Sequence, residues 1–261
     1  EMITLAKFLA ISGIILPMLP NENLIPDINL TPYSIWLATV VVSGISYLSY
    51  LLKRYVFHES GTLVSGIIGG LYSSTATISV LARKSRKASE QEATEYVAAM
   101  LLAVSMMFLR FMILILIFSR EIFLSIYPYL LIMSVVSAIV GWFVHSRQKL
   151  PKDTSVESEE DDSSNPLEFK VALIFAVLFV VFTVLTHYTL VYAGTSGLNL
   201  LSFVSGFSDI TPFILNLLQN TGSVAVLIIT ACSMQAIVSN ILVNMFYALF
   251  FAGKRSKLRP W

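Results

Sequence analysis

The sequence predicts an all-α integral membrane protein, with six transmembrane helices and two re-entrant helical hairpins in an inverted repeat. Composition gives the first reason: 56% of the residues are hydrophobic and 13% are charged, whereas soluble domains carry about 25% charged residues. Eight long apolar stretches give the second reason. The third is that two of these stretches are broken at their centres by glycine and hydroxyl residues, in sequences that resemble each other.

Six of the stretches are uninterrupted and long enough to cross a bilayer, which takes about 20 helical residues. We therefore expect transmembrane helices near residues 2–20, 34–54, 94–118, 122–146, 167–192 and 225–252. No cleavage-site pattern follows the first of them, so we interpret it as a retained helix rather than a signal peptide. The single cysteine excludes an internal disulfide and a zinc cluster built from cysteines.

The two broken stretches, 62–82 and 197–218, align with each other when Gly70 is set on Gly206, a shift of 136 residues. The long helix that follows each of them aligns at a similar shift of 134. Interrupted hydrophobic segments in matching positions of two halves indicate the substrate site of a membrane transporter. A pathway for an ion or a solute is therefore the leading hypothesis.

Lysine and arginine residues indicate whether the broken stretches cross the membrane, because these residues collect in short cytoplasmic loops. The chain has 17 of them, and Arg110 lies within a predicted helix. If all eight stretches cross, the other 16 divide equally between the two sides. If only the first broken stretch is re-entrant the ratio is 11 to 5, and if both are re-entrant, 15 lie inside and only Arg120 lies outside. The charge distribution favours two re-entrant hairpins.

Three crossings and one hairpin per half give an inverted repeat, because an odd number of crossings turns the second half upside down. We predict repeats at 1–147 and 148–261, the second needing the helix at 122–146 to complete its three crossings. The acidic stretch 152–165 is interpreted as a cytoplasmic tether. The hairpin tips are expected near the midplane. The protein is predicted to be a multi-pass protein of the cell's inner (plasma) membrane with both termini in the cytoplasm.

The first hairpin is predicted to break after Gly69 and Gly70, which would end one half-helix, and Ser73, Ser74 or Thr75 would cap the next. Helix N-termini favour anions, whereas C-terminal carbonyls and hydroxyl groups suit cations. A simpler alternative is that these small residues only allow helices to approach each other closely.

The second break is predicted at Gly206, with Ser208 or Asp209 as the cap of a helix that carries Pro212 in its first turn. Asp209 is the only carboxylate expected at mid-depth and Arg110 the only cation. Ionisable residues inside a membrane are candidates for a functional site by default. The alternative is a structural pair, in which Asp209 caps its helix and neutralises Arg110 without contacting substrate.

Two amides on the last helix, Asn240 and Asn244, are four residues apart and project from one face. Asn244 aligns with Arg110 between the two halves. Hydrogen bonding between helices is the alternative role for both. The residues expected along the ion pathway are Gly69, Gly70, Ser73, Ser74, Thr75, Gly206, Ser208, Asp209, Thr211, Arg110, Asn240 and Asn244.

Sequence signatures of enzymes are missing. The chain has no HExxH, GxSxG, P-loop or Rossmann pattern, so we predict neither an enzyme nor a bound cofactor. Its basic clusters lie at membrane ends, where the topology rule explains them, so nucleic acid is not an expected partner. The expected partners are the lipid bilayer, a small inorganic ion and a second copy of the chain, since six helices are few to shield a polar midplane from lipid.

Motifs along nearly the whole chain resemble those of one prokaryotic membrane family. They are Leu16-Pro-Met-Leu-Pro20, Val42-Ser-Gly-Ile-Ser46, Gly69-Gly-Leu-Tyr-Ser-Ser-Thr-Ala76, Asn165-Pro-Leu-Glu168 and Ser205-Gly-Phe-Ser-Asp209. The chain is similar in these motifs to domain of unknown function 4010, often fused behind an MgtC/SapB-type domain. The resemblance implies a membrane domain associated with inorganic ion handling, magnesium included, and a partner domain of the MgtC type. A lysine commonly stands in this family where this chain has Asn244.

The leading function is transport of a small inorganic ion at the midplane between the hairpins. An Asp209 carboxylate with carbonyl and hydroxyl oxygens suits a hard cation, and Mg²⁺ keeps several waters and needs only one or two carboxylates. The physical arguments for a cation and for an anion are nearly balanced, and the MgtC association favours a divalent cation such as magnesium, with Asp209 as the metal-contacting residue. The alternatives are an anion channel or transporter that uses half-helix N-termini and Arg110, and a regulatory membrane subunit that transports nothing.

Overall fold

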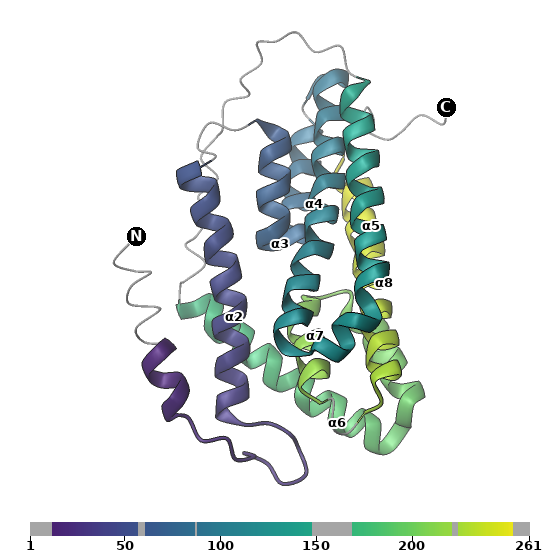
Figure 1. Ribbon diagram of the computed structural model, residues 1–261. Helices are drawn as coiled ribbons and strands as arrows, with labels where there is room; N and C mark the ends of the chain where they lie inside the picture. Colours follow the sequence, from purple (N-terminus) through teal and green to yellow (C-terminus); the bar gives the residue numbers. More distant parts are fainter. Residues whose placement is uncertain (1–11, 57–60, 87, 148–168, 221–223, 253–261) are drawn as a thin grey trace. The chain divides into compact units, whose positions relative to one another are not determined.

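The computed structural model describes residues 12–56, 61–86, 88–147, 169–220 and 224–252, which are predominantly helical (Figure 1). The elements are α2 (Pro32–Leu51), the π-helical turn η1 (Leu52–Val56), α3 (Thr62–Ser85), α4 (Glu90–Phe118), α5 (Arg120–Ser146), α6 (Phe169–Ser205), α7 (Ile210–Gln219) and α8 (Val226–Phe251). Within these described residues, β structure is limited to one isolated antiparallel bridge between Ile25 and Ile28. The prediction of an all-α protein is confirmed.

Six of the described helices are long and apolar enough to cross a membrane, so the chain is a multi-pass membrane protein. They are α2 with most of η1, α3, α4, α5, α6 and α8. Five of them correspond to predicted transmembrane helices, and the sixth, α3, is the first broken stretch. Much of the helix predicted at 2–20, and the whole tether at 152–165, lie outside the described residues.

One face of α5 carries large apolar side chains that are exposed, as expected of a helix in contact with lipid. Ile132, Ile139 and Trp142 are 61% to 67% exposed. A soluble monomer rarely exposes such a contiguous apolar surface, whereas hydrocarbon accommodates it without cost.

The described chain forms two compact units, and the long helices α2, α4, α5 and α8 each contribute to both. The first unit comprises 1–44, 114–125 and 164–240. The second unit comprises 45–113, 126–163 and 241–261. The repeat boundaries at 147 and 148 stay a prediction.

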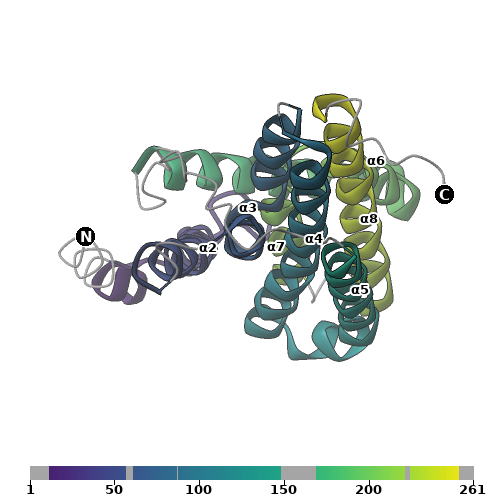
Figure 2. The ribbon, with the colours of Figure 1, turned by 90° about the horizontal axis from the view of Figure 1, so that it is seen from above.

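Close helix packing in the second unit depends on glycines of α3, which lies beside α4 (Figures 1 and 2). A Cβ atom on Gly66 would lie 2.4 Å from the carbonyl oxygen of Ala99, and one on Gly70 would lie 2.5 Å from that of Ala103. The surrounding core consists of Ile78, Leu81, Ala82, Tyr96, Ala99, Met100 and Ala103. These two glycines therefore have the packing role that the simpler alternative gave them.

Serine hydroxyls join α4 to α5 in the same unit. The Ser105 hydroxyl donates to the Ser134 carbonyl at 2.9 Å, and the Ser134 hydroxyl donates to the Ser105 carbonyl at 3.0 Å. One turn away, the Ser137 hydroxyl donates to the Leu101 carbonyl at 2.9 Å. Hydrogen bonds of this kind hold membrane helices together where hydrophobic burial cannot.

The first unit pairs α6 with the short helix α7. α6 is interrupted at Gly194, where φ is 59° and ψ is −151°, a conformation that favours glycine. Every residue of α7 from Ile210 to Leu218 is buried. The rings of Phe182 and Phe213 meet edge to face, with centroids 5.6 Å apart.

Adding a methyl group at Gly70 tests the close packing of α3 on α4. Gly70→Ala is expected to cost about 1–3 kcal/mol of stability, because the new Cβ overpacks against the Ala103 backbone. The control is Gly44→Ala in α2, where no atom lies within 4 Å of the new Cβ and alanine is the better helix former by about 1 kcal/mol. Thermal unfolding in detergent measures both, and equal melting temperatures for the two variants would contradict the packing role.

Candidate functional site

The first break lies at Ser73, in the middle of α3. Its backbone is extended, with φ −158° and ψ 105°, between two helical segments. The Ser73 hydroxyl accepts a hydrogen bond from the Ala76 backbone N–H at 3.4 Å, the arrangement of an N-cap. The expectation that Gly69 and Gly70 end the first half-helix is wrong, because the helix continues through both to Tyr72.

The chain turns back on itself at this break. A Cβ atom on Gly69 would lie 2.5 Å from the Thr77 hydroxyl oxygen, although eight residues of straight α-helix would separate the two positions by about 12 Å. The two halves of α3 therefore lie against each other near Ser73. Of the neighbouring candidates, Ser74 is buried and Thr75 is partly buried.

Arg110 of α4 holds the end of the first half-helix. Its guanidinium donates a hydrogen bond to the carbonyl oxygen of Tyr72, the last residue before the break. The last carbonyls of a helix have no partner within the helix, and a cation is favoured there by the helix dipole. Arg110 is only 8% exposed, so its charge lies inside the unit.

The second break lies between α6 and α7. α6 ends at Ser205, and Asp209 is the N-cap of α7, accepting from the Thr211 backbone N–H at 2.9 Å through Oδ1. Of the two predicted caps, Ser208 and Asp209, the structure selects Asp209, and the predicted place of Pro212 in the first turn is confirmed. The Asp209 side chain is exposed and Thr211 is buried.

Two side chains of α8 hold the end of α6. The Asn240 amide donates to the Gly206 carbonyl at 3.1 Å, and the Ser239 hydroxyl donates to the Phe203 carbonyl at 2.7 Å. A Cβ atom on Gly206 would lie 2.4 Å from the Ser239 Cβ. Glycine at 206 therefore allows α8 to come close enough for both hydrogen bonds.

The two breaks thus share one arrangement, in which a polar side chain from a later helix donates to a carbonyl at or next to the end of the preceding helix. The carbonyls of Tyr72 and Gly206 are 134 residues apart, the shift found between the helices that follow. The donors are not equivalent, since Arg110 aligns with Asn244 and the donor is Asn240, one turn earlier. The longer arginine side chain spans the extra rise of about 6 Å. Asn244 is buried in the second unit, at 1% exposure.

The remaining candidate, Ser208, donates its hydroxyl to the Ser205 carbonyl at 3.1 Å and is exposed. No three His, Cys, Asp or Glu side chains gather within the part of the chain that the structure describes. The role of Asp209 as a metal ligand stays a prediction, as does its suggested pairing with Arg110.

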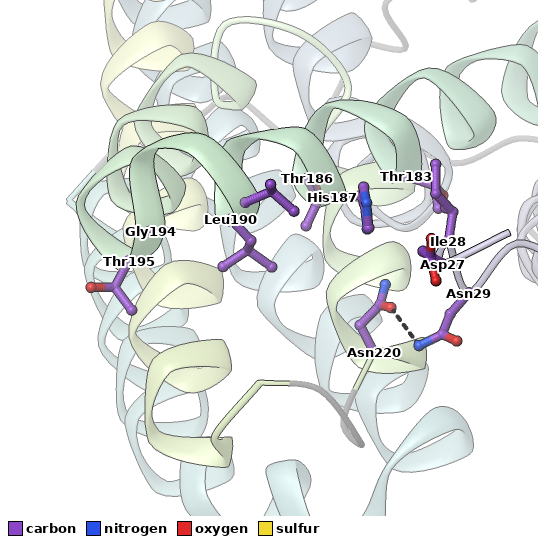
Figure 3. Close-up of a pocket in the computed structure, with 11 residues that line it drawn as sticks. Asp27, Ile28, Asn29, Thr183, Thr186, His187, Leu190, Gly194, Thr195 and Asn220 are labelled. Carbon is purple, nitrogen blue, oxygen red and sulfur yellow. Dashed lines mark hydrogen bonds between the residues drawn. The ribbon is translucent and has the colours of Figure 1, made fainter. Parts of the chain in front are cut away.

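A cavity of about 450 Å³ in the first unit, lined by both polar and apolar side chains, was missed in the sequence (Figure 3). It lies among the loop at 27–29, α6 from Thr183 to Thr195, and Asn220 after α7. Beside it, the Asn216 amide donates to the Thr183 hydroxyl at 2.6 Å. The available signal was the polar run on one side of α6, with Thr183, Thr186 and His187, but its partners come from a loop and a helix far along the chain.

Comparison with known proteins gives a family and one relative. The family described as Domain of unknown function (DUF4010) matches residues 40–252. A protein of Aquifex aeolicus (strain VF5), itself described as uncharacterized, is 26% identical over 205 residues, which cover 77% of this chain and 87% of that protein. No solved structure matches the chain.

Two substitutions separate the cap at Asp209 from its charge. Asp209→Ala is expected to lower stability by about 1 kcal/mol, because α7 loses its N-cap, whereas Asp209→Asn should unfold near the wild-type temperature, since asparagine caps equally well. Thermal unfolding in detergent at neutral pH is the measurement. A destabilisation by asparagine as large as that by alanine would show that the charge, and not the cap, stabilises this break.

Proposed function

We propose that this chain, which belongs to the DUF4010 family, is a membrane transporter or channel for a small inorganic ion. One observation carries the proposal: two apolar segments are broken, and at each break a polar side chain from another helix donates to a carbonyl at or next to the end of the preceding helix. Polar groups are expensive inside a bilayer and are kept where they serve a pathway. Irregular backbone at that depth is tolerated where protein or a water-filled cavity surrounds it.

The lengths of the half-helices support the re-entrant hairpins. Each half-helix contains 10 to 12 residues, or about 15–18 Å of helix. The four half-helices are 62–72, 74–85, 195–205 and 210–219. The hydrocarbon layer is about 30 Å thick. A segment of this length reaches the midplane and not the far side, so a pair of them suits a hairpin that enters and returns.

Matching contacts support the repeat. Gly70 meets Ala103 in the second unit, and Gly206 meets Ser239 in the first unit. Both members of the second pair stand 136 residues after those of the first. This is the shift that aligns the broken segments, and the charge distribution supports the inverted orientation.

The chemistry at the breaks favours a cation. Asp209 uses Oδ1 on the Thr211 N–H, and its second carboxylate oxygen can face an ion. Arg110 bonds the Tyr72 carbonyl, which gives it a structural role and weakens the anion alternative. We therefore propose a divalent cation such as magnesium, which needs one or two carboxylates and keeps most of its waters.

Ion flux into liposomes that contain only this chain tests the proposal. Wild type is expected to pass Mg²⁺, and Asp209→Asn should lower the rate about tenfold or more, because a charge-assisted contact of about 1.5–3 kcal/mol is lost. Na⁺ and Cl⁻ are measured in parallel. A wild type that passes only chloride, or no ion at all, would overturn the proposal.

The matched control is Glu92→Gln. Glu92 accepts from the Ser89 N–H and hydroxyl at 2.8 and 2.9 Å at the start of α4, and glutamine can keep this capping box. The control removes one negative charge away from both breaks, so its flux should equal that of wild type. An equal fall in both variants would mean that Asp209 acts only through the overall charge.

Cysteine labelling tests the hairpins. In a Cys232→Ser background, Gly61→Cys and Arg86→Cys, at exposed positions flanking α3, should both react only from the cytoplasm. Ser196→Cys and Ala225→Cys, also exposed, should both react only from outside. Membrane-impermeant maleimide on oriented vesicles gives the readout. Labelling of Gly61→Cys and Arg86→Cys from opposite sides would mean that α3 crosses the membrane.

A further inference from the structure

The cavity of the first unit combines apolar lining residues, Ile28, Leu190 and Val191, with a set of polar ones. Its walls carry one carboxylate, Asp27, together with the hydroxyls of Thr183 and Thr186 and the amide of Asn29 (Figure 3). His187 and Asn220 complete the polar lining. None of these residues belongs to the two breaks. In the predicted topology, the loop at 27–29 and this part of α6 lie at the outer ends of the helices.

Asp27 stands at an unusual backbone position. Its φ is 66°, and the Ile28 N–H donates to the Ile25 carbonyl at 3.2 Å, so residues 25–28 form a β-turn with Pro26 at its second position. A positive φ at the third position of such a turn usually selects glycine or asparagine. The turn therefore places an exposed carboxylate where a glycine would serve the backbone better.

The hydrogen bonds around the cavity leave mainly oxygen acceptors facing it. The Asn29 Nδ2 donates to the side-chain oxygen Oδ1 of Asn220 at 3.4 Å, so the side-chain oxygen of Asn29 remains as an acceptor. The Thr183 hydroxyl donates its hydrogen to the Phe179 carbonyl at 2.8 Å. The Thr183 oxygen in turn accepts from the Asn216 amide, so the Asp27 carboxylate and the Asn29 oxygen supply the negative charge and lone pairs that attract a cation.

Thr186 supplies an independent sign that something occupies the cavity. It is 2% exposed, and its hydroxyl oxygen has no hydrogen-bond partner among the described residues. A buried hydroxyl without a partner costs about 1–3 kcal/mol. A cavity of about 450 Å³ has room for roughly 15 waters at about 30 Å³ each, which is enough for an ion together with its water shell.

We infer that this cavity binds a hydrated divalent cation, with Asp27 as the charged ligand and the Asn29 and Thr186 oxygens as partners of the ion's waters. A single carboxylate with waters is how Mg²⁺ is usually held. Carboxylate, carbonyl and water ligands suit Mg²⁺ and Mn²⁺ alike. The inference rests on the proposed function for its ligand class and adds a capture site, at the outer end of the helices, that is separate from Asp209.

Binding of Mn²⁺ to the full chain in detergent tests the site, read by its electron paramagnetic resonance signal and by competition with Mg²⁺. Asp27→Asn should weaken Mn²⁺ binding at least about tenfold, because the ligand charge is lost. Asparagine suits the positive φ as well as aspartate does, so the variant keeps the turn. Asp27→Gly, which also keeps it, should give the same loss. Glu22→Gln, in the same loop but outside the cavity lining, is the control and should bind as wild type does.

Thr186→Val adds a readout that a structural role alone would not give. Replacing a buried unpartnered hydroxyl by a methyl group should leave stability equal or higher, while Mn²⁺ affinity should fall. Unchanged affinity in Asp27→Asn, an equal loss in Glu22→Gln, or a wild type that binds no Mn²⁺ would overturn the site. Normal Mg²⁺ flux together with Mn²⁺ binding that does not depend on Asp27 would reject the binding site in the cavity and leave the proposed transport function standing. Mn²⁺ binding that depends on Asp27, in a chain that passes no cation, would support the binding site and reject the transport function.

Discussion

A helix that breaks inside an apolar segment leaves backbone carbonyls without partners, and hydrocarbon contains no water to satisfy them. The structure meets this constraint twice with the same solution. Arg110 bonds the Tyr72 carbonyl in one unit, and Asn240 bonds the Gly206 carbonyl in the other. The amide ends that follow are satisfied locally, by caps at Ser73 and Asp209. Each break thus combines donation from another helix, by Arg110 at the first and by Ser239 and Asn240 at the second, with one local acceptor.

The close packing at the glycines and the hydrogen bonds to the carbonyls at the breaks depend on each other. The amide of Asn240 reaches the Gly206 carbonyl because glycine has no Cβ atom. A Cβ at that position would collide with Ser239, the preceding residue of α8. Any side chain there would push α8 away and remove the donor. At the first break Gly70 allows the same approach to Ala103. The packing role of these glycines is therefore compatible with the proposed ion pathway, because the packing brings the hydrogen-bond donor to the break.

The two breaks differ in charge. The first is held by a guanidinium, which is always protonated. The second is held by a neutral amide and carries a carboxylate at its cap. The sign of the proposed ion therefore depends on these side chains, because the two breaks carry opposite charges.

The sequence by itself determined the membrane environment, the helical class and the place of the second break, and it narrowed the cap of that break to Ser208 or Asp209. Hydropathy, helix length and cap chemistry depend on residues a few positions apart, so they can be read along the chain. The first break was predicted slightly too early, at Gly69 and Gly70, because glycine inside a helix signals close packing as readily as a helix end. Only the tertiary structure decided which side chains hold the breaks. Arg110 lies 38 residues from Tyr72, and Asn240 lies 34 from Gly206. The cavity at Thr186 likewise joins a loop, α6 and the end of α7. Such contacts depend on the register of packed helices, which no local pattern specifies.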